Sequence, residues 1–197
     1  MKHQIKNRIT SKVLFECDIP DDVETVNEVK YALAKAVKEK ATMSHAGLSG
    51  ADLYYANLSG AYLSRADLSG SYLSRSYLNG ADLNGAKLNG ANLSGADLSR
   101  SYLNGAKLNG AKLKNNEVLV GNRPIFSIGP IGSRPDNFIA YITDKGIRLD
   151  AGCKKNITLE EFEGLLSETH GNNVHGREYR AALALISIHH ELWGVKK

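Results

Sequence analysis

The middle of the chain places an apolar residue at every fifth position. The series starts at Met43 and continues with a leucine at each fifth position as far as Leu113. A small residue stands two places before each of them, and it is Ala except at Ser71, Ser76 and Ser101. The register is unbroken over fifteen copies, residues 41–115. Such a fixed period is typical of a repeat architecture.

A five-residue period fits neither a helix nor a continuous strand. In a helix, at about 100° per residue, successive leucines would be turned by about 140°, so that no apolar stripe forms. In a strand, side chains alternate between the two faces, so every second leucine would point the wrong way. A short extended segment followed by a corner buries the whole set, because the first and third residues of each copy then share one face.

The fifth residue of each copy is expected to turn the chain. It is Gly in nine of the fifteen copies, which matches the positive φ that a type II turn needs at its third position. Six copies carry another residue, and for these we expect another turn geometry: His45, Tyr55, Arg65, Arg75, Arg100 and Asn115. Corners that all turn one way wind the chain into coils, which stack by main-chain pairing about 4.8 Å apart.

This pattern, Ala-(Asp/Asn)-Leu-x-x, resembles that of the pentapeptide-repeat family. The resemblance implies a right-handed, four-sided β-helix. The second position departs from the pattern, since it is Asp or Asn in only six copies. We predict a mainly β fold: a right-handed quadrilateral β-helix over residues 41–115, an N-terminal hairpin-plus-helix cap over residues 1–40, and a small α+β domain over residues 116–197.

The flanking segments have ordinary strand and helix patterns. Before the repeat, two short strands precede an apolar 3.6-residue periodicity, and Asp22 is the expected N-cap of that helix. We expect the helix to lie across the first coil. After the repeat, β-branched and aromatic residues predict three or four strands over residues 117–152. A helix capped by Thr158 and Glu161 and a second helix over residues 177–193 follow.

Both flanks are similar to pentapeptide-repeat proteins of bacteriophages and prophages. The similar stretches are KNRITSKVLFECDIPDD near the start and GCKKNITLEEFEGLLSETHGNNVHGREYRAALALISIHHELWG near the end. The second stretch is uncharacterised in those proteins. The resemblance therefore implies a phage or prophage origin, and it assigns no reaction.

Charge and cysteine usage narrow the function further. The repeat carries seven basic and four acidic residues, too small an excess to indicate nucleic-acid binding. The best known activity of the resembling family is DNA mimicry, in which an acidic rod occupies the DNA site of a topoisomerase; a basic repeat disfavours it.

Two distant cysteines, Cys17 and Cys153, do not form a disulfide framework. No run reaches the roughly 18 apolar residues of a membrane span. We expect a protein of the bacterial host cytoplasm with no membrane partner.

Candidate catalytic and metal sites are incomplete. Cys153 with His170 and His175 is a conceivable nucleophile or zinc set, but neither spacing is recognisable, and HGNNVHG is also typical of a helix-to-helix loop. His189 and His190 are expected at packed or interfacial positions. We predict no enzymatic activity, no metal site and no cofactor.

The outward positions carry the strongest functional signal. Tyr and Arg, which are enriched at protein interfaces, concentrate between residues 54 and 77, although ladders that only stabilise the stack would look similar. The candidate binding surface is Tyr54, Tyr55, Tyr62, Arg65, Tyr72, Arg75, Tyr77 and Arg100.

The leading prediction is a non-enzymatic interaction protein that presents this surface to a protein partner of unknown identity. The alternative is an anion- or nucleotide-binding module that uses Arg65, Arg75 and Arg100. The apolar last helix either closes a homodimer through the C-terminal domain or packs on its own domain.

Overall fold

The chain forms two compact units, Met1–Asn116 and Glu117–Lys197. The computed structural model describes residues 1–121, 123–129, 131–132, 138–151 and 154–194. Each unit is treated by itself. Within the described residues, the helices are too short or too polar to cross a membrane.

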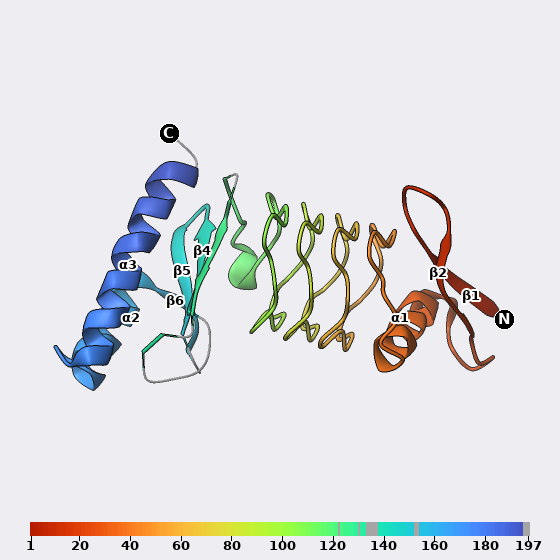
Figure 1. Ribbon diagram of the computed structural model, residues 1–197, viewed down its shortest axis with the longest axis horizontal. Helices are drawn as coiled ribbons and strands as arrows, with labels where there is room; N and C mark the ends of the chain where they lie inside the picture. Colours follow the sequence, from red (N-terminus) through yellow and green to blue (C-terminus); the bar gives the residue numbers. More distant parts are fainter. Residues whose placement is uncertain (122, 130, 133–137, 152–153, 195–197) are drawn as a thin grey trace. The chain divides into compact units, whose positions relative to one another are not determined.

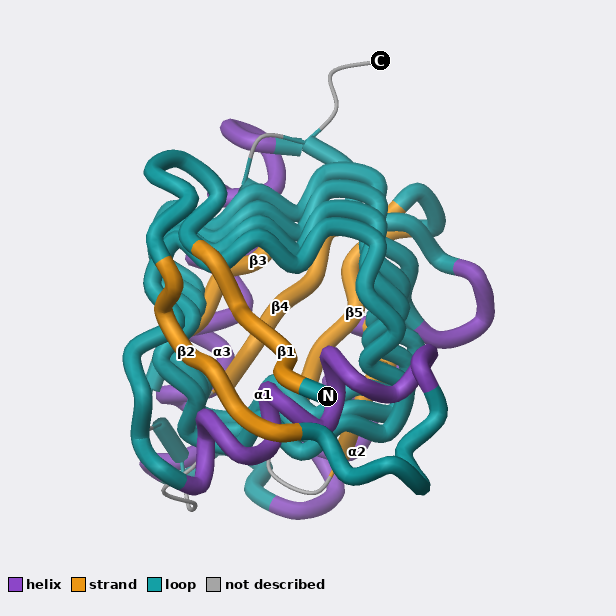
Figure 2. Tube along the Cα trace, turned by 90° about the vertical axis from the view of Figure 1, so that its right-hand side faces the viewer, coloured by secondary structure: helices purple, strands orange, loops and turns teal. Residues whose placement is uncertain are grey.

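The first unit begins with a hairpin and a helix. The strands β1 (Lys2–Lys6) and β2 (Val13–Asp18) pair antiparallel, and the helix α1 (Glu28–Lys38) follows. The hairpin is bonded to the first coil, because the amide of Gly47 donates to the carbonyl of Lys6 at 3.0 Å. Figures 1 and 2 show hairpin and helix together at this end of the stack.

The predicted N-cap at Asp22 is wrong. The α1 helix starts at Glu28 with Asn27 as its N-cap, and a 3-10 turn, Thr25–Asn27, precedes it. Only Val23 and Glu24 lie between Asp22 and this turn, and the amide of Val23 donates to the carbonyl of Pro20 at 3.1 Å. The chain is therefore in a tight turn at Asp22, and the expected first helical turn does not form there.

The repeat segment is a stack of twenty-residue coils, a β-helix-like arrangement. Parallel bridges join residues twenty apart, as in the column Thr42, Tyr62, Asp82 and Tyr102. Since each copy has five residues, one coil contains four copies. Within residues 41–113 the coils pair through single bridges rather than strands of several residues, and leucine amides donate to the next coil, for example Leu48 to the carbonyl of Asp67 at 2.8 Å. Figure 1 shows the coils lying one upon another.

The leucines fill the inside of the coils, as predicted. Those from Leu53 to Leu88 are fully buried, whereas Leu103 is partly exposed. Ser71 and Ser76 take the place of inward alanines, and their hydroxyls donate to the leucine carbonyl three residues earlier at 2.7 and 2.8 Å. The interior is therefore apolar apart from hydroxyls that the main chain satisfies.

The second unit is an antiparallel sheet with two helices. The strand order is β3-β4-β5-β6, and the elements are β3 (Ile125–Ile128), β4 (Phe138–Thr143), β5 (Gly146–Ala151), β6 (Lys154–Thr158), α2 (Leu159–Thr169) and α3 (Val174–Trp193). The rings of Phe138, Phe162 and Tyr179 pack with centroids 5.1 to 5.8 Å apart. These rings form the centre of the core between sheet and helices.

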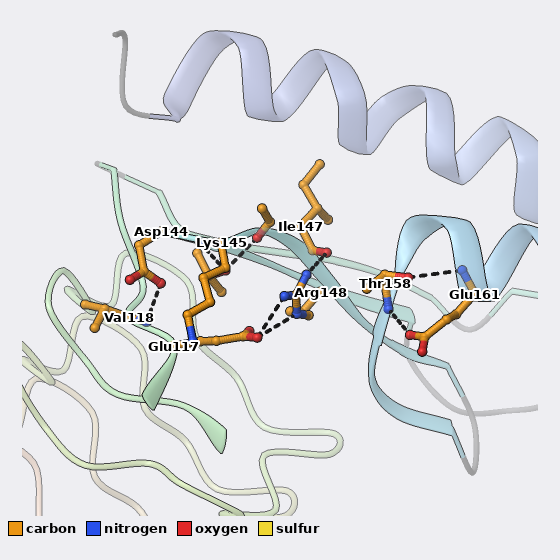
Figure 3. A network of polar contacts seen from close by, with 10 residues as sticks. Glu117, Val118, Asp144, Lys145, Ile147, Arg148, Thr158 and Glu161 are labelled. Carbon is orange, nitrogen blue, oxygen red and sulfur yellow. Dashed lines mark hydrogen bonds and ion pairs between the residues drawn. The ribbon is translucent and has the colours of Figure 1, made fainter. Parts of the chain in front are cut away.

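The second unit confirms one predicted cap and corrects one boundary. Thr158 and Glu161 form the expected capping box, with distances of 3.1 and 2.7 Å (Figure 3). The α3 helix, in contrast, starts at Val174 rather than Arg177. Its N-cap is Asn173, and Gly176 in its first turn is required by close packing, because a Cβ there would lie 2.3 Å from the carbonyl oxygen of Gly171.

A buried ion pair fixes the start of the second unit to β5. Glu117 is 4% exposed, and the guanidinium of Arg148 donates to its Oε1 from Nε at 3.0 Å and from Nη2 at 2.8 Å (Figure 3). The other carboxylate oxygen, Oε2, is buried without a hydrogen-bond partner among the described residues. Arg148 is therefore the group that compensates the buried carboxylate of Glu117 among the described residues.

Candidate interaction surface

The Asp and Asn residues at the second position of the copies cap the corners. In all six, a side-chain oxygen accepts a hydrogen bond from the amide two residues later, at 2.9 to 3.2 Å: Asp52, Asn57, Asp67, Asp82, Asn92 and Asp97. The sequence-based prediction assigned these residues no role in the corners. The signal was present, since Asp and Asn characteristically bond their own backbone two residues on.

Asp67 combines this cap with an ion pair. Lys87, in the next coil of the same column, lies 3.5 Å from its carboxylate. Partial burial raises the pKa of Asp67, but the hydrogen bonds from Ser69 and the charge of Lys87 outweigh it and hold that pKa below its usual value. The acidic charge is thus engaged within the stack.

The prediction of another turn geometry at the corners without glycine is wrong for five of the six. Their φ values are 56° to 62°, close to the 66° to 77° of the glycine corners: His45, Tyr55, Arg65, Arg75 and Arg100. At the sixth corner the chain enters a 3-10 turn, Lys114–Asn116, instead. The ladder between coils imposes one corner geometry, so these side chains adopt the left-handed conformation at a cost of about 1–2 kcal/mol each.

The structure divides the candidate residues between corners. Because one coil has four copies, corners ten residues apart in the chain lie on opposite sides of the coil. Arg75 therefore shares a corner column with Tyr55, whereas Arg65 lies at the opposite corner with His45. Arg100 belongs to a third column, with the corners of residues 60 and 80. The candidates do not form one continuous patch.

One corner gathers four of the six tyrosines of the repeat around an arginine. We call it the aromatic corner: Tyr54, Tyr55, Tyr72, Arg75 and Tyr77. Tyr72 and Tyr77 lie on two neighbouring faces of the coil. These two faces meet at the corner of Arg75, because the two tyrosines flank Arg75 in the chain. The guanidinium of Arg75 donates to the hydroxyl of Tyr55 and lies 5.6 Å from its ring centroid. The rings of Tyr54 and Tyr55 meet edge to face at 4.4 Å. The four tyrosines are 43% to 58% exposed.

The opposite corner carries a polar groove of about 540 Å³, which we call the basic groove: Ser44, His45, Ser64, Arg65, Asn84, Gly85 and Asn104. The Nδ1 atom of His45 is buried there without a hydrogen-bond partner among the described residues. Gly85 leaves room for Arg65, because a Cβ there would lie 3.2 Å from its Cγ. Tyr62 lies on a face next to this corner.

The histidine and cysteine candidates give no complete site within the described residues. Cys153 lies outside those residues. The rings of His170 and His175 meet at 5.8 Å, and Nε2 of His189 is 2.8 Å from the carbonyl oxygen of Arg123, which is the packed position expected. Cys17 is buried, and burial raises the pKa of its thiol.

The Arg75–Tyr55 hydrogen bond predicts a measurable shift of a titration. A hydrogen bond from Arg75 lowers the pKa of the Tyr55 hydroxyl because it favours the phenolate. In the variant Arg75→Gly, Tyr55 should therefore titrate at higher pH. Nuclear magnetic resonance of the chain labelled at the tyrosine ring would follow this hydroxyl. Arg65→Gly is the control and should leave it unchanged; an equal midpoint in wild type and Arg75→Gly would contradict the contact.

The fold of the repeat segment defines its class, and a comparison with known families then shows which repeat it contains. A coil of short copies with inward leucines and paired columns defines a solenoid repeat protein. The family model for pentapeptide repeats matches residues 39–70 and 76–115, in eight copies. The match places this repeat segment, which is less than half of the chain, among pentapeptide repeats.

Solved structures of pentapeptide repeat proteins are similar to the repeat segment. One from the thylakoid lumen of Arabidopsis thaliana is 30% identical over 38% of this chain and 55% of that chain, with a TM-score of 0.31. HetL of Nostoc sp. strain PCC 7120, a protein involved in heterocyst differentiation regulation, is 40% identical over 38% of this chain and 33% of that chain, with a TM-score of 0.27. A third, from Nostoc PCC 7120, is 30% identical over 44% and 80%, with a TM-score of 0.21.

These similarities cover only part of each solved structure. The chain spans 55% and 33% of the first two proteins, and TM-scores this low support no conclusion about function. No curated protein matches the chain.

Proposed function

We propose that this protein is a non-enzymatic interaction protein of phage or prophage type, in the cytoplasm of a bacterial host, whose aromatic corner binds a protein partner. Its repeat is then the right-handed, four-sided β-helix of its family. The observation that supports the proposal is the left-handed backbone of Tyr55 and Arg75. Glycine fits that corner at lower cost. Strain of this kind clusters at functional sites, where the side chain matters more than the turn.

The chemistry of the aromatic corner suits a protein surface. Tyr and Arg are the side chains that most often dominate binding energy at interfaces. Arg75 is held by Tyr55, so binding loses less side-chain freedom. The exposed ring faces offer apolar area, while the guanidinium and hydroxyls offer hydrogen bonds. A partner with an apolar patch beside a carboxylate or carbonyl acceptor fits this arrangement.

A capture experiment tests this proposal. The variant Tyr55→Gly, Tyr72→Ser, Arg75→Gly should keep its melting temperature within a few degrees, because all three side chains are exposed. It should lose the partner that the wild-type chain captures from expressing cells. The control Tyr102→Ser, Lys107→Ser changes outward residues farther along the stack and should keep the partner. A variant that stays folded and still captures the partner would refute the proposal.

A second candidate function, anion binding, is favoured by the basic groove. The side chain of Arg65 has no ion-pair or hydrogen-bond partner among the described residues, and the other lining groups are an imidazole, hydroxyls, amides and a glycine. No carboxylate lines the groove, so an anion there meets only donors and neutral dipoles. Its volume is within the range of ligand sites.

Thermal melting separates this candidate from the first. Inorganic phosphate and a nucleotide panel, each at about a hundred times the dissociation constant, would stabilise the fold by about 2.7 kcal/mol. The variant Arg65→Gly should lose that shift, and the aromatic-corner variant should retain it. A melting temperature that millimolar ligand leaves unchanged rejects anion binding and leaves the protein-partner proposal intact.

A further inference from the structure

The last helix, α3, is apolar on two opposite faces. One face packs on its own unit through Tyr179, Leu183 and Ile186. The opposite face carries exposed apolar side chains, and we call it the α3 stripe: Val174, Ala181, Leu185, Ile188 and Leu192. The four larger ones are 51% to 64% exposed. The sequence left open whether this helix packs on its own domain or on a second copy. In the structure the first face packs on its own unit, and the α3 stripe is exposed.

The α3 stripe has the spacing of a helix–helix seam. Its positions are separated by seven, four, three and four residues, which matches alternating a and d positions of a coiled coil. The position that completes the series is Glu178, whose carboxylate accepts a hydrogen bond from the amide of Gly132 at 2.7 Å. This hydrogen bond holds the carboxylate of Glu178 against its own unit, and the rest of the seam is apolar.

The charges beside the α3 stripe decide the direction of pairing. Arg177, Ala184 and Glu191 flank it on one side, and Arg177 and Glu191 form no ion pair among the described residues. Each lies seven residues from Ala184, about 10.5 Å along the helix axis in opposite directions. In an antiparallel pair centred on Ala184, each Arg177 faces Glu191 of the other copy. In a parallel pair, Arg177 would face Ala182, which is buried in its own unit.

We propose that α3 pairs antiparallel with α3 of a second copy of this chain through the α3 stripe. The proposal does not depend on the aromatic corner or the basic groove. Two symmetric Arg177–Glu191 contacts make the surface complementary to itself, as a two-fold dimer requires. The small side chain of Ala184 at the centre allows the helices to approach closely.

Sedimentation equilibrium of the full chain over about 1 to 100 µM tests the pairing. The apparent mass should rise from 21.4 kDa toward twice that value. Ile188→Asp should weaken the dimer by at least about tenfold, because each dimer then holds two buried carboxylates at the seam. Ser187→Asp is the matched control, as it places the same carboxylate on the neighbouring residue away from the stripe, and should leave the dimer intact.

A charge exchange tests the direction. Arg177→Glu should weaken the dimer about threefold to tenfold, since it sets like charges opposite each other. Adding Glu191→Arg should restore it to within about threefold. Circular dichroism verifies that each variant is folded. A wild-type chain that stays monomeric, a dimer that tolerates Ile188→Asp, or a double exchange that fails to restore it would overturn the proposal.

Discussion

Replacing Leu73 with alanine is expected to lower the free energy of unfolding of the first unit by about 2–5 kcal/mol. Leu73 is fully buried in the middle of the stack, and its amide donates to the carbonyl of Asn92 in the next coil at 2.8 Å. The coils above and below are bonded to this backbone and cannot collapse onto the cavity. Urea unfolding followed by circular dichroism measures the loss.

The neighbouring residue provides the control for Leu73. Tyr72 is 58% exposed, so Tyr72→Ala should change the same free energy by no more than about 0.5 kcal/mol. The two variants truncate adjacent side chains, of which Leu73 points into the stack and Tyr72 points outward. Equal losses for Leu73→Ala and Tyr72→Ala would contradict the assignment of inward and outward positions.

Replacing Arg148 with methionine is expected to destabilise the second unit by about 3–5 kcal/mol. The substitution leaves the carboxylate of Glu117 buried with no compensating charge, since Oε1 accepts two hydrogen bonds from Arg148 and Oε2 is already without a partner among the described residues. Thermal or urea unfolding followed at the near-ultraviolet signal of Trp193 would measure it.

A double variant shows whether the charge is the cause. Glu117→Leu together with Arg148→Met removes both members of the pair, and such apolar replacements are often neutral or stabilising. The double variant should therefore regain most of the stability that Arg148→Met loses. If the double variant is as unstable as the single one, packing of the Arg148 side chain, rather than the unpaired charge, accounts for the loss.

The repeat could be predicted from the sequence because its period admits a single solution. A leucine at every fifth residue cannot be buried by a helix or a strand, so the chain has to bend at fixed intervals. The count of four copies per coil is implied by the resemblance to pentapeptide repeats and not by the period, and the bridges confirm the column of Thr42, Tyr62, Asp82 and Tyr102 that follows from it. The capping box of Thr158 and Glu161 was equally readable, since it is a local signal.

The corners could not be predicted because their conformation is set by neighbouring coils and not by local preference. Arg75 by itself favours negative φ, yet the ladder gives it a φ of 57°. The start of α1 at Glu28 also depended on a 3-10 turn that no residue pattern marked.

The candidate site was predicted in part. The candidate surface counted Arg65 and Arg75 together, although four copies per coil already place Arg75 beside Tyr55 and Arg65 beside His45, at opposite corners, and the bridges confirm these columns. The contact of Tyr55 with Arg75 joins residues twenty apart, and it was accessible only through the assumed four copies per coil. Whether a tyrosine or arginine there binds a partner or only supports its neighbour is not encoded in the pattern, because both roles favour the same residue types.

The unfolding free energy of the variant Tyr55→Gly, Arg65→Gly, Arg75→Gly decides between those roles most directly. Relief of the left-handed strain offsets the greater freedom of glycine in the unfolded chain, and the lost contacts are exposed. If the side chains serve recognition, the variant should unfold within about 1 kcal/mol of the wild type. A loss of more than about 3 kcal/mol would show that these corners hold the stack together and would contradict the assignment of a binding surface.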